Sequence, residues 1–93
     1  MTKAEDILQT ACDIMKERGA RRDQGQERSM ERIVTVFNAL TDHKLTEVDG
    51  WTFMVILKLC REHTGHDMDN WIDATAYMAL AAEAAVDTPP KPW

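Results

Sequence analysis

The sequence predicts an all-α, single-domain protein with a four-helix, bundle-like arrangement that forms oligomers. Apolar residues recur at helical spacing in four stretches that polar segments separate. The composition is globular, with 44% hydrophobic and 29% charged residues and few glycines and prolines, which argues against disorder. A chain of 93 residues buries a modest share of its surface, so self-association would add stability.

The first helix is expected from Thr2 to Gly19. Thr2 and Glu5 have the spacing of a capping box, and Gly19 is a typical C-terminal stop. A polar connector follows over residues 19–28, and it contains no β-branched or aromatic residue. The apolar positions of this helix include Ala4, Leu8, Ala11 and Met15.

The second and third helices carry most of the large apolar residues. The second runs from about Glu27 to Leu40, and the third covers 47–64, with Thr46 as its N-cap and Gly65 at its end. The third helix has little polar face, so we expect a central position, covered by neighbours or by another subunit. Its β-branched and aromatic content also fits a buried strand, but its length and polar ends favour a helix. Gly50 would permit a close backbone contact. The second helix has an apolar stripe of Met30, Ile33, Val34, Phe37 and Leu40.

The fourth helix is expected to begin at a cap formed by Asp67 or Asp69 and to end near Val86. Its many alanines favour helix and allow close packing against a neighbour. Residues 1–87 would then form one helical domain, and residues 88–93 an extended tail.

Net charge and hydropathy limit the classes of partner. A net charge of -5 disfavours general nucleic-acid binding. Apolar stretches such as FMVIL are too short to cross a membrane, so we expect a cytoplasmic protein that does not bind membranes. Cys12 and Cys60 lie on apolar helical faces and are expected to be reduced core residues.

An acidic stripe on the fourth helix is the first candidate site. Asp69, Asp73 and Tyr77 lie four residues apart and so share one helical face. The second helix offers Glu27 and Glu31 at the same spacing, and carboxylates from two helices can hold Mg²⁺ between them. The alternatives are a solvated surface or a salt-bridge seam.

Basic residues supply the second candidate site. Lys58 and Arg61 share a face of the most apolar helix, where charges need partners, and Asp69 and Asp73 could pair with them. The alternative is that these bases contact a phosphate whose metal the acids hold. Arg22 belongs to an arginine-rich connector that could also bind phosphate, although a solvated loop with local ion pairs is the commoner arrangement.

The stretch from about Arg22 to Glu83 resembles a family of small, largely uncharacterised tailed-phage and prophage proteins. The resemblance is carried by an Arg-Asp-containing loop, "ERSM" before a helix with "FNAL", and "WTFM" leading into "LKLCR". More distantly, the arrangement of LK-x-x-R followed by D-x-x-x-D-x-x-x-Y is similar to phage nucleotide-modification-associated proteins. Through them it is similar to MazG-type all-α nucleoside-triphosphate pyrophosphohydrolases.

The second resemblance implies a scaffold that binds Mg²⁺ with acids from two helices and works as a dimer or tetramer. It places Asp73 at a metal-binding aspartate and Asp69 one turn earlier. The Glu-x-x-Glu of the first metal helix is absent, since Glu27 and Glu31 have a four-residue spacing. Whether the chain is an enzyme is therefore left open by the sequence.

Two functional hypotheses follow. In the first, a phage accessory protein binds a nucleotide through Mg²⁺ and, if active, releases pyrophosphate by metal-activated water attack. In the second, a non-enzymatic phage protein binds and inhibits a host defence or replication factor. Both place the chain in the cytoplasm of an infected or lysogenic bacterial host, and both include self-association through the third and fourth helices.

Overall fold

The computed structural model describes residues 2–23 and 29–86, with side chains for 2–19 and 29–86. Four helices account for most of this part of the chain: α1 (Ala4–Asp23), α2 (Ser29–Thr41), α3 (Glu47–Thr64) and α4 (Met68–Val86). The described residues contain no strand, so the all-α fold class is confirmed and the strand alternative for α3 is wrong. None of the four helices combines the length and the apolar character that crossing a bilayer requires.

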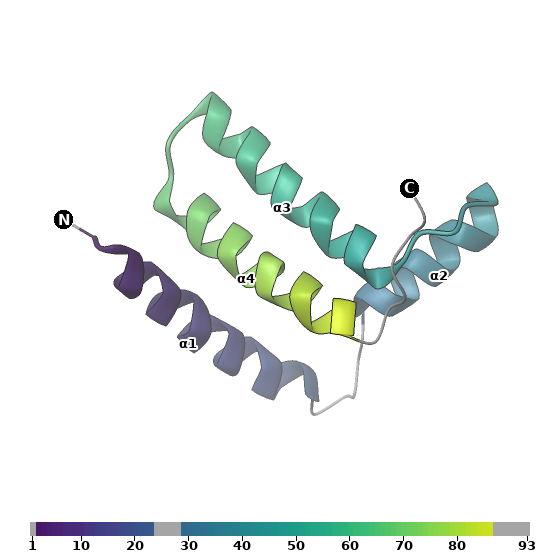
Figure 1. Ribbon diagram of the computed structural model, residues 1–93, viewed down its shortest axis with the longest axis horizontal. Helices are drawn as coiled ribbons and strands as arrows, with labels where there is room; N and C mark the ends of the chain where they lie inside the picture. The colour runs from purple at the N-terminus through teal and green to yellow at the C-terminus, as the bar shows by residue number, and fades with distance from the viewer. Residues whose placement is uncertain (1, 24–28, 87–93) are drawn as a thin grey trace.

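The helices pack in the spatial order α1, α4, α3, α2. Figure 1 shows α1, α4 and α3 side by side, with α2 at the end of α3 and projecting away from it. The antiparallel α3–α4 hairpin is the largest contact, α1 packs against α4, and α2 packs against α3. Within the described ranges α1 and α2 do not pack against each other, so the four helices do not close into a ring.

Side-chain caps define the ends of the α3–α4 hairpin as the sequence predicts. Asp49 donates its backbone N–H to Thr46 Oγ1 (3.3 Å), and Asp49 Oδ2 accepts the Thr46 backbone N–H (2.8 Å), which completes a capping box. The backbone N–H of Gly65 closes α3 on the carbonyl of Arg61 (3.2 Å). Asp67 caps α4, because its Oδ1 accepts the Asp69 N–H at 2.9 Å.

Both ends of α1 differ from the prediction. The start is one residue later, since Asp6 accepts the Lys3 backbone N–H (3.2 Å) in place of the expected pair at Thr2 and Glu5. Gly19 does not end the helix, which continues to Asp23. No described glycine has a positive φ, and good helix formers follow Gly19, so the cost of about 1 kcal/mol for an interior glycine is tolerated.

The joint between α2 and α3 is closely packed. The Asn38 side chain binds Leu45 at both backbone groups: Nδ2 donates to the carbonyl and Oδ1 accepts the N–H, each at 2.9 Å. On the α3 side Gly50 is buried, and a Cβ built on it would overlap the Met30 side chain and lie 3.2 Å from Val34 Cγ1. The predicted close backbone contact at Gly50 is therefore confirmed, and α2 is the helix that makes it.

The buried core is small for a chain of this length. Ala11, Met30, Val34 and Ala74 are the buried hydrophobic residues among those described. Cys12 and Cys60 are free and exposed, so their expected core positions are wrong. The expectation that α3 is covered on nearly all sides is also not met within one chain, because four of its large apolar side chains remain exposed. These are Phe53, Ile56, Leu57 and Leu59.

Substituting Gly50 with alanine is expected to destabilise the protein by about 1 kcal/mol. The added methyl group overlaps Met30, and overpacking of about 1–3 kcal/mol outweighs the gain of about 1 kcal/mol in helix propensity. Urea unfolding followed by circular dichroism measures the difference. Gly19→Ala is the matched control, because nothing lies within 4 Å of the added Cβ, and it should gain about 0.5–1 kcal/mol. A stabilised Gly50→Ala protein would contradict the packing.

Candidate functional site

An ion pair between Lys58 and Asp73 joins the middle of α3 to the middle of α4. Lys58 Nζ lies 2.9 Å from Asp73 Oδ2, and the two side chains are 13% and 18% exposed. Partial burial makes each charge depend on the other, because an unpaired charge here would lose hydration without compensation. The predicted salt bridge between the two helices is thus formed at Asp73. The Lys58 ammonium group supplies the positive charge that the partly buried Asp73 carboxylate needs.

The Glu62 carboxylate is the centre of a second polar cluster, at the turn between α3 and α4. Its Oε2 accepts hydrogen bonds from His66 Nδ1 and, at 2.6 Å, from Trp71 Nε1. Its Oε1 accepts the Asp67 backbone N–H at 2.8 Å and Asn70 Nδ2 at 3.1 Å. Four donors on two oxygens leave the side chain 14% exposed, so Glu62 ties the end of α3 to the first turn of α4.

The hydrogen bonds shift both titrating groups of this Glu62 cluster. The pKa of Glu62 falls from 4.5 to about 2, because His66 and then the Asp67 N–H stabilise the carboxylate, and Asn70 and Trp71 add to the effect. The pKa of His66 rises above 6.5, since the Glu62 hydrogen bond and charge favour the imidazolium. The Glu62 contribution to stability is present above pH 4.5 and is lost as the pH falls through about 2. The His66 contribution is full below pH 6.5 and is lost as the pH rises through its folded pKa.

Tyr77, the third residue of the acidic stripe, has a packing role at the opposite end of the hairpin. Its ring stacks on Trp51 of α3, with centroids 5.7 Å apart and planes 20° from parallel. Trp51 with Tyr77, Lys58 with Asp73 and Glu62 with Asn70 follow one another along the seam. The seam therefore fixes the register of α3 on α4 at both ends and in the middle.

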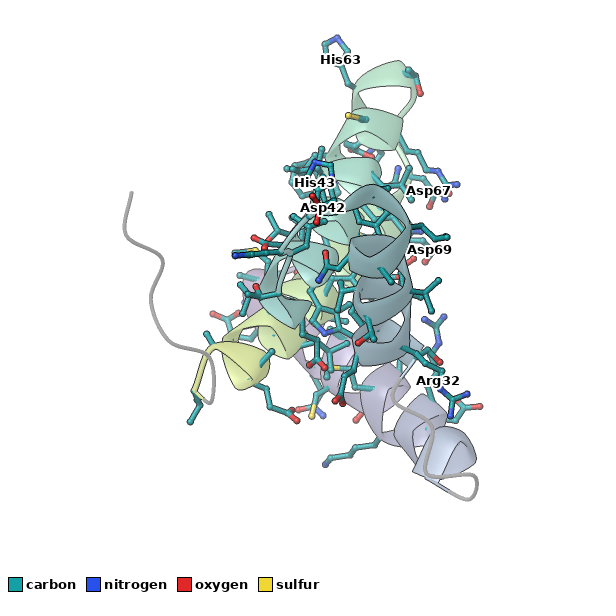
Figure 2. All side chains as sticks on the ribbon, turned by 90° about the vertical axis from the view of Figure 1, so that its right-hand side faces the viewer. Arg32, Asp42, His43, His63, Asp67 and Asp69 are labelled. Atoms are coloured by element: carbon teal, nitrogen blue, oxygen red, sulfur yellow. The ribbon has the colours of Figure 1, made fainter. Side chains whose placement is uncertain are left out.

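The remaining candidate site residues do not gather around this seam. Asp69 and Arg61 are exposed and form no ion pair among the described residues. Glu31 is exposed on α2, which makes no contact with α4 in the described part of the chain. Figure 2 shows Asp67 and Asp69 with their side chains at the molecular surface. Glu27 and the side chain of Arg22 lie outside the described residues.

No group of three or more His, Cys, Asp or Glu side chains that could hold a metal ion occurs among the described residues. Asp73 is neutralised by Lys58, and Asp69 is separate from Glu31, since their helices are not neighbours. The residues that the magnesium hypothesis needs are thus not assembled within the described part of a single chain.

The apolar face of α2 is an exposed surface that no other described helix covers. Its side chains line a shallow, apolar depression, and Leu40 is 80% exposed. We call this surface the α2 face. It consists of Ile33, Val36, Phe37 and Leu40, with Arg32 at its edge.

A second shallow groove lies between α1 and α4. Leu8, Cys12 and Met15 contribute from α1, and Ala76 and Ala79 contribute from α4. Small alanine side chains let the two helices approach, as the composition of α4 predicts, and they leave little apolar side chain to fill the space between them. This groove has no polar group that would orient a ligand beyond Lys16 and Thr75 at its edge.

Sequence reasoning missed Glu62. The signal was present in REHTGHD: a glutamate one turn before a helix-ending glycine, with His66 four residues on and the free N–H groups of the next helix start directly after it. The missing information was that the turn folds α4 back onto α3, which brings Trp71 to the carboxylate.

Comparison with known proteins identifies a family. A family model described as a domain of unknown function, DUF6378, matches residues 6–85. The chain belongs to the DUF6378 family. The match covers all of α2 and α3 and all of α4 except Val86, so the hairpin seam and the α2 face both lie within the DUF6378 domain. No curated protein and no solved structure matches the chain.

Replacing Glu62 with glutamine is expected to lower the melting temperature at pH 7 by several degrees, because a neutral amide cannot accept four hydrogen bonds. The difference from the wild type should shrink as the pH falls from 4.5 towards about 2, where the native carboxylate becomes protonated. Scanning calorimetry over this pH range measures the difference in melting temperature between Glu62→Gln and the wild type. Glu83→Gln, at an exposed position of α4, is the control and should change little. A melting-temperature difference between Glu62→Gln and the wild type that does not depend on pH would rule out the electrostatic role of Glu62.

Proposed function

We propose that this DUF6378 protein is a non-enzymatic helical interaction module that binds a protein through the α2 face. The observation that carries the proposal is the α2 face itself, a row of large apolar side chains on a helix whose other side is already packed on α3. Contiguous exposed apolar surface on a small protein is typical of a protein-binding site. A host factor as target, and the phage origin that the resemblance implies, stay predictions from sequence.

The location of α2 supports this proposal. The helix stands at the end of the hairpin and projects from it (Figure 1), so a partner can approach without displacing α1 or α4. Met30 and Val34 anchor it to Gly50, and Asn38 anchors the segment that leads back to α3. The α2 face is therefore held in place before binding, which reduces the entropy lost on association.

Photo-crosslinking tests the α2 face. The photoreactive residue p-benzoylphenylalanine in place of Leu40 should give a protein adduct of defined mass in the cells where the protein occurs. The same residue in place of Glu83, exposed on α4, should not. The Leu40 adduct should disappear when Ile33→Glu is added, because a charge would be buried in the contact. If position 40 gives no adduct, or the same adducts as position 83, the proposal fails.

Nucleotide binding through Mg²⁺ is the second candidate. It is favoured by the position of Lys58 next to Asp73, which provides a cation and a carboxylate at one point of the seam, with Asp69 exposed one turn away. On this hypothesis Lys58 and Arg61 contact phosphate, and the ion is held by Asp69 and Asp73 with acids from elsewhere.

A thermal-shift series with nucleoside triphosphates, with and without Mg²⁺, tests nucleotide binding. The hypothesis predicts a rise of a few degrees that requires Mg²⁺ and is lost in Asp69→Asn. This substitution is preferable to Asp73→Asn, which would also leave Lys58 without its partner. Glu83→Gln should keep the shift. The absence of any Mg²⁺-dependent shift would exclude this candidate.

A further inference from the structure

We infer that the partner of the α2 face is a second copy of the chain, with the two α2 helices packed antiparallel about a two-fold axis. This inference rests on the proposed function and names its partner. It differs from the sequence expectation, which placed self-association on α3 and α4.

The spacing of the α2 face fits self-pairing. Ile33, Val36, Phe37 and Leu40 follow the i, i+3, i+4, i+7 pattern, which is the pattern of a helix that packs along another helix. A two-fold axis between positions 36 and 37 brings Ile33 of one copy to Leu40 of the other. It also brings Val36 to Phe37. Each large side chain thus meets another large side chain, and the same surface serves both copies.

Charges at the two ends of α2 select the antiparallel arrangement. Arg32 lies near the start of the helix and Asp42 directly after its end, and Figure 2 shows them at opposite ends of α2, with His43 beside Asp42. In the antiparallel register Arg32 of each copy lies level with Thr41 and Asp42 of the other. Glu31 in turn lies level with Asp42, one residue from His43 and two from Lys44. A parallel pair would place Arg32 against Arg32 and Asp42 against Asp42, so like charges disfavour it.

The size of the α2 face sets the strength of the dimer. Four half-exposed or more exposed side chains offer on the order of 400 Å² of apolar surface, against about 800 Å² per partner in a standard interface. Their burial gives a reversible dimer with a Kd on the order of micromolar. Occupancy of the α2 face therefore depends on protein concentration.

Sedimentation equilibrium of the full chain tests the inference. The native protein should pass from monomer to dimer between about 1 and 200 µM. Ile33→Glu should remain monomeric, with a loss of about 100-fold or more in affinity, because it would bury two charges in the contact. Thr35→Glu is the matched control, on the side of α2 away from the α2 face, and should dimerise like the native chain. Circular dichroism confirms that each variant is folded.

A charge exchange tests the antiparallel register. Arg32→Glu and Asp42→Arg should each weaken the dimer about tenfold, because attraction at both ends becomes repulsion. The double variant should recover most of the native affinity. If the double variant instead loses as much affinity as the two single variants combined, the antiparallel pairing is overturned.

Two results would overturn the inference while leaving the proposed function intact. One is a native chain that remains monomeric over this concentration range and yet gives a crosslink from position 40 to a different protein. The other is a dimer that Ile33→Glu does not affect, together with such a crosslink. The absence of every adduct from position 40 would remove the proposed function and this inference together.

Discussion

The antiparallel pairing of α3 with α4 is the constraint on which the other features depend. Glu62 holds the turn, the Lys58–Asp73 ion pair holds the middle, and Trp51 stacked on Tyr77 holds the open end. A carboxylate that is already saturated with donors cannot be released without leaving those donors unsatisfied. The hairpin is therefore the rigid element to which α1 and α2 are added, one at each side.

The hairpin also explains why so much apolar surface remains exposed. With α1 beside α4 and α2 at the end of α3, the described helices form an open row and not a closed bundle (Figure 1). A helical layer that carries apolar residues on more than one face needs a second layer to cover them. The chain has no further described element for that purpose, and the proposed association would cover this surface. The exposed apolar surface supports the proposed interaction function more directly than it supports any chemistry.

The acidic stripe is divided by the same packing. Asp73 is drawn into the seam by Lys58, and Tyr77 by Trp51, while Asp69 stays at the surface. These three residues share one helical face by spacing, but Asp73 and Tyr77 contact α3 and Asp69 is exposed to solvent, because α3 covers only part of that face. Lys58, one of the two bases that suggested a phosphate site, forms the ion pair with Asp73 that joins the two helices of the hairpin.

Much of the secondary structure could be predicted because its causes are local. The capping box at Thr46 and Asp49, the aspartate cap of α4 and the stop at Gly65 depend on side chains within a few residues of the backbone groups they bind. The close approach at Gly50 was also predictable, since a glycine near the start of an apolar helix has few other uses. Both local failures lie in α1. Its start is one residue later than the predicted cap at Thr2, and it continues past Gly19 because a glycine without positive φ is only a weak interruption.

What the tertiary structure alone decided is which faces meet. The sequence by itself determined four helices, their caps and their apolar stripes, because helix periodicity and capping are properties of neighbouring residues. It did not determine that α2 would bury Met30 and Val34 yet leave Leu40 in solvent, or that Glu62 would accept a hydrogen bond from Trp71 nine residues away. Those outcomes depend on helix crossing and on the order α1, α4, α3, α2, which the balance of long-range contacts sets and no local pattern encodes.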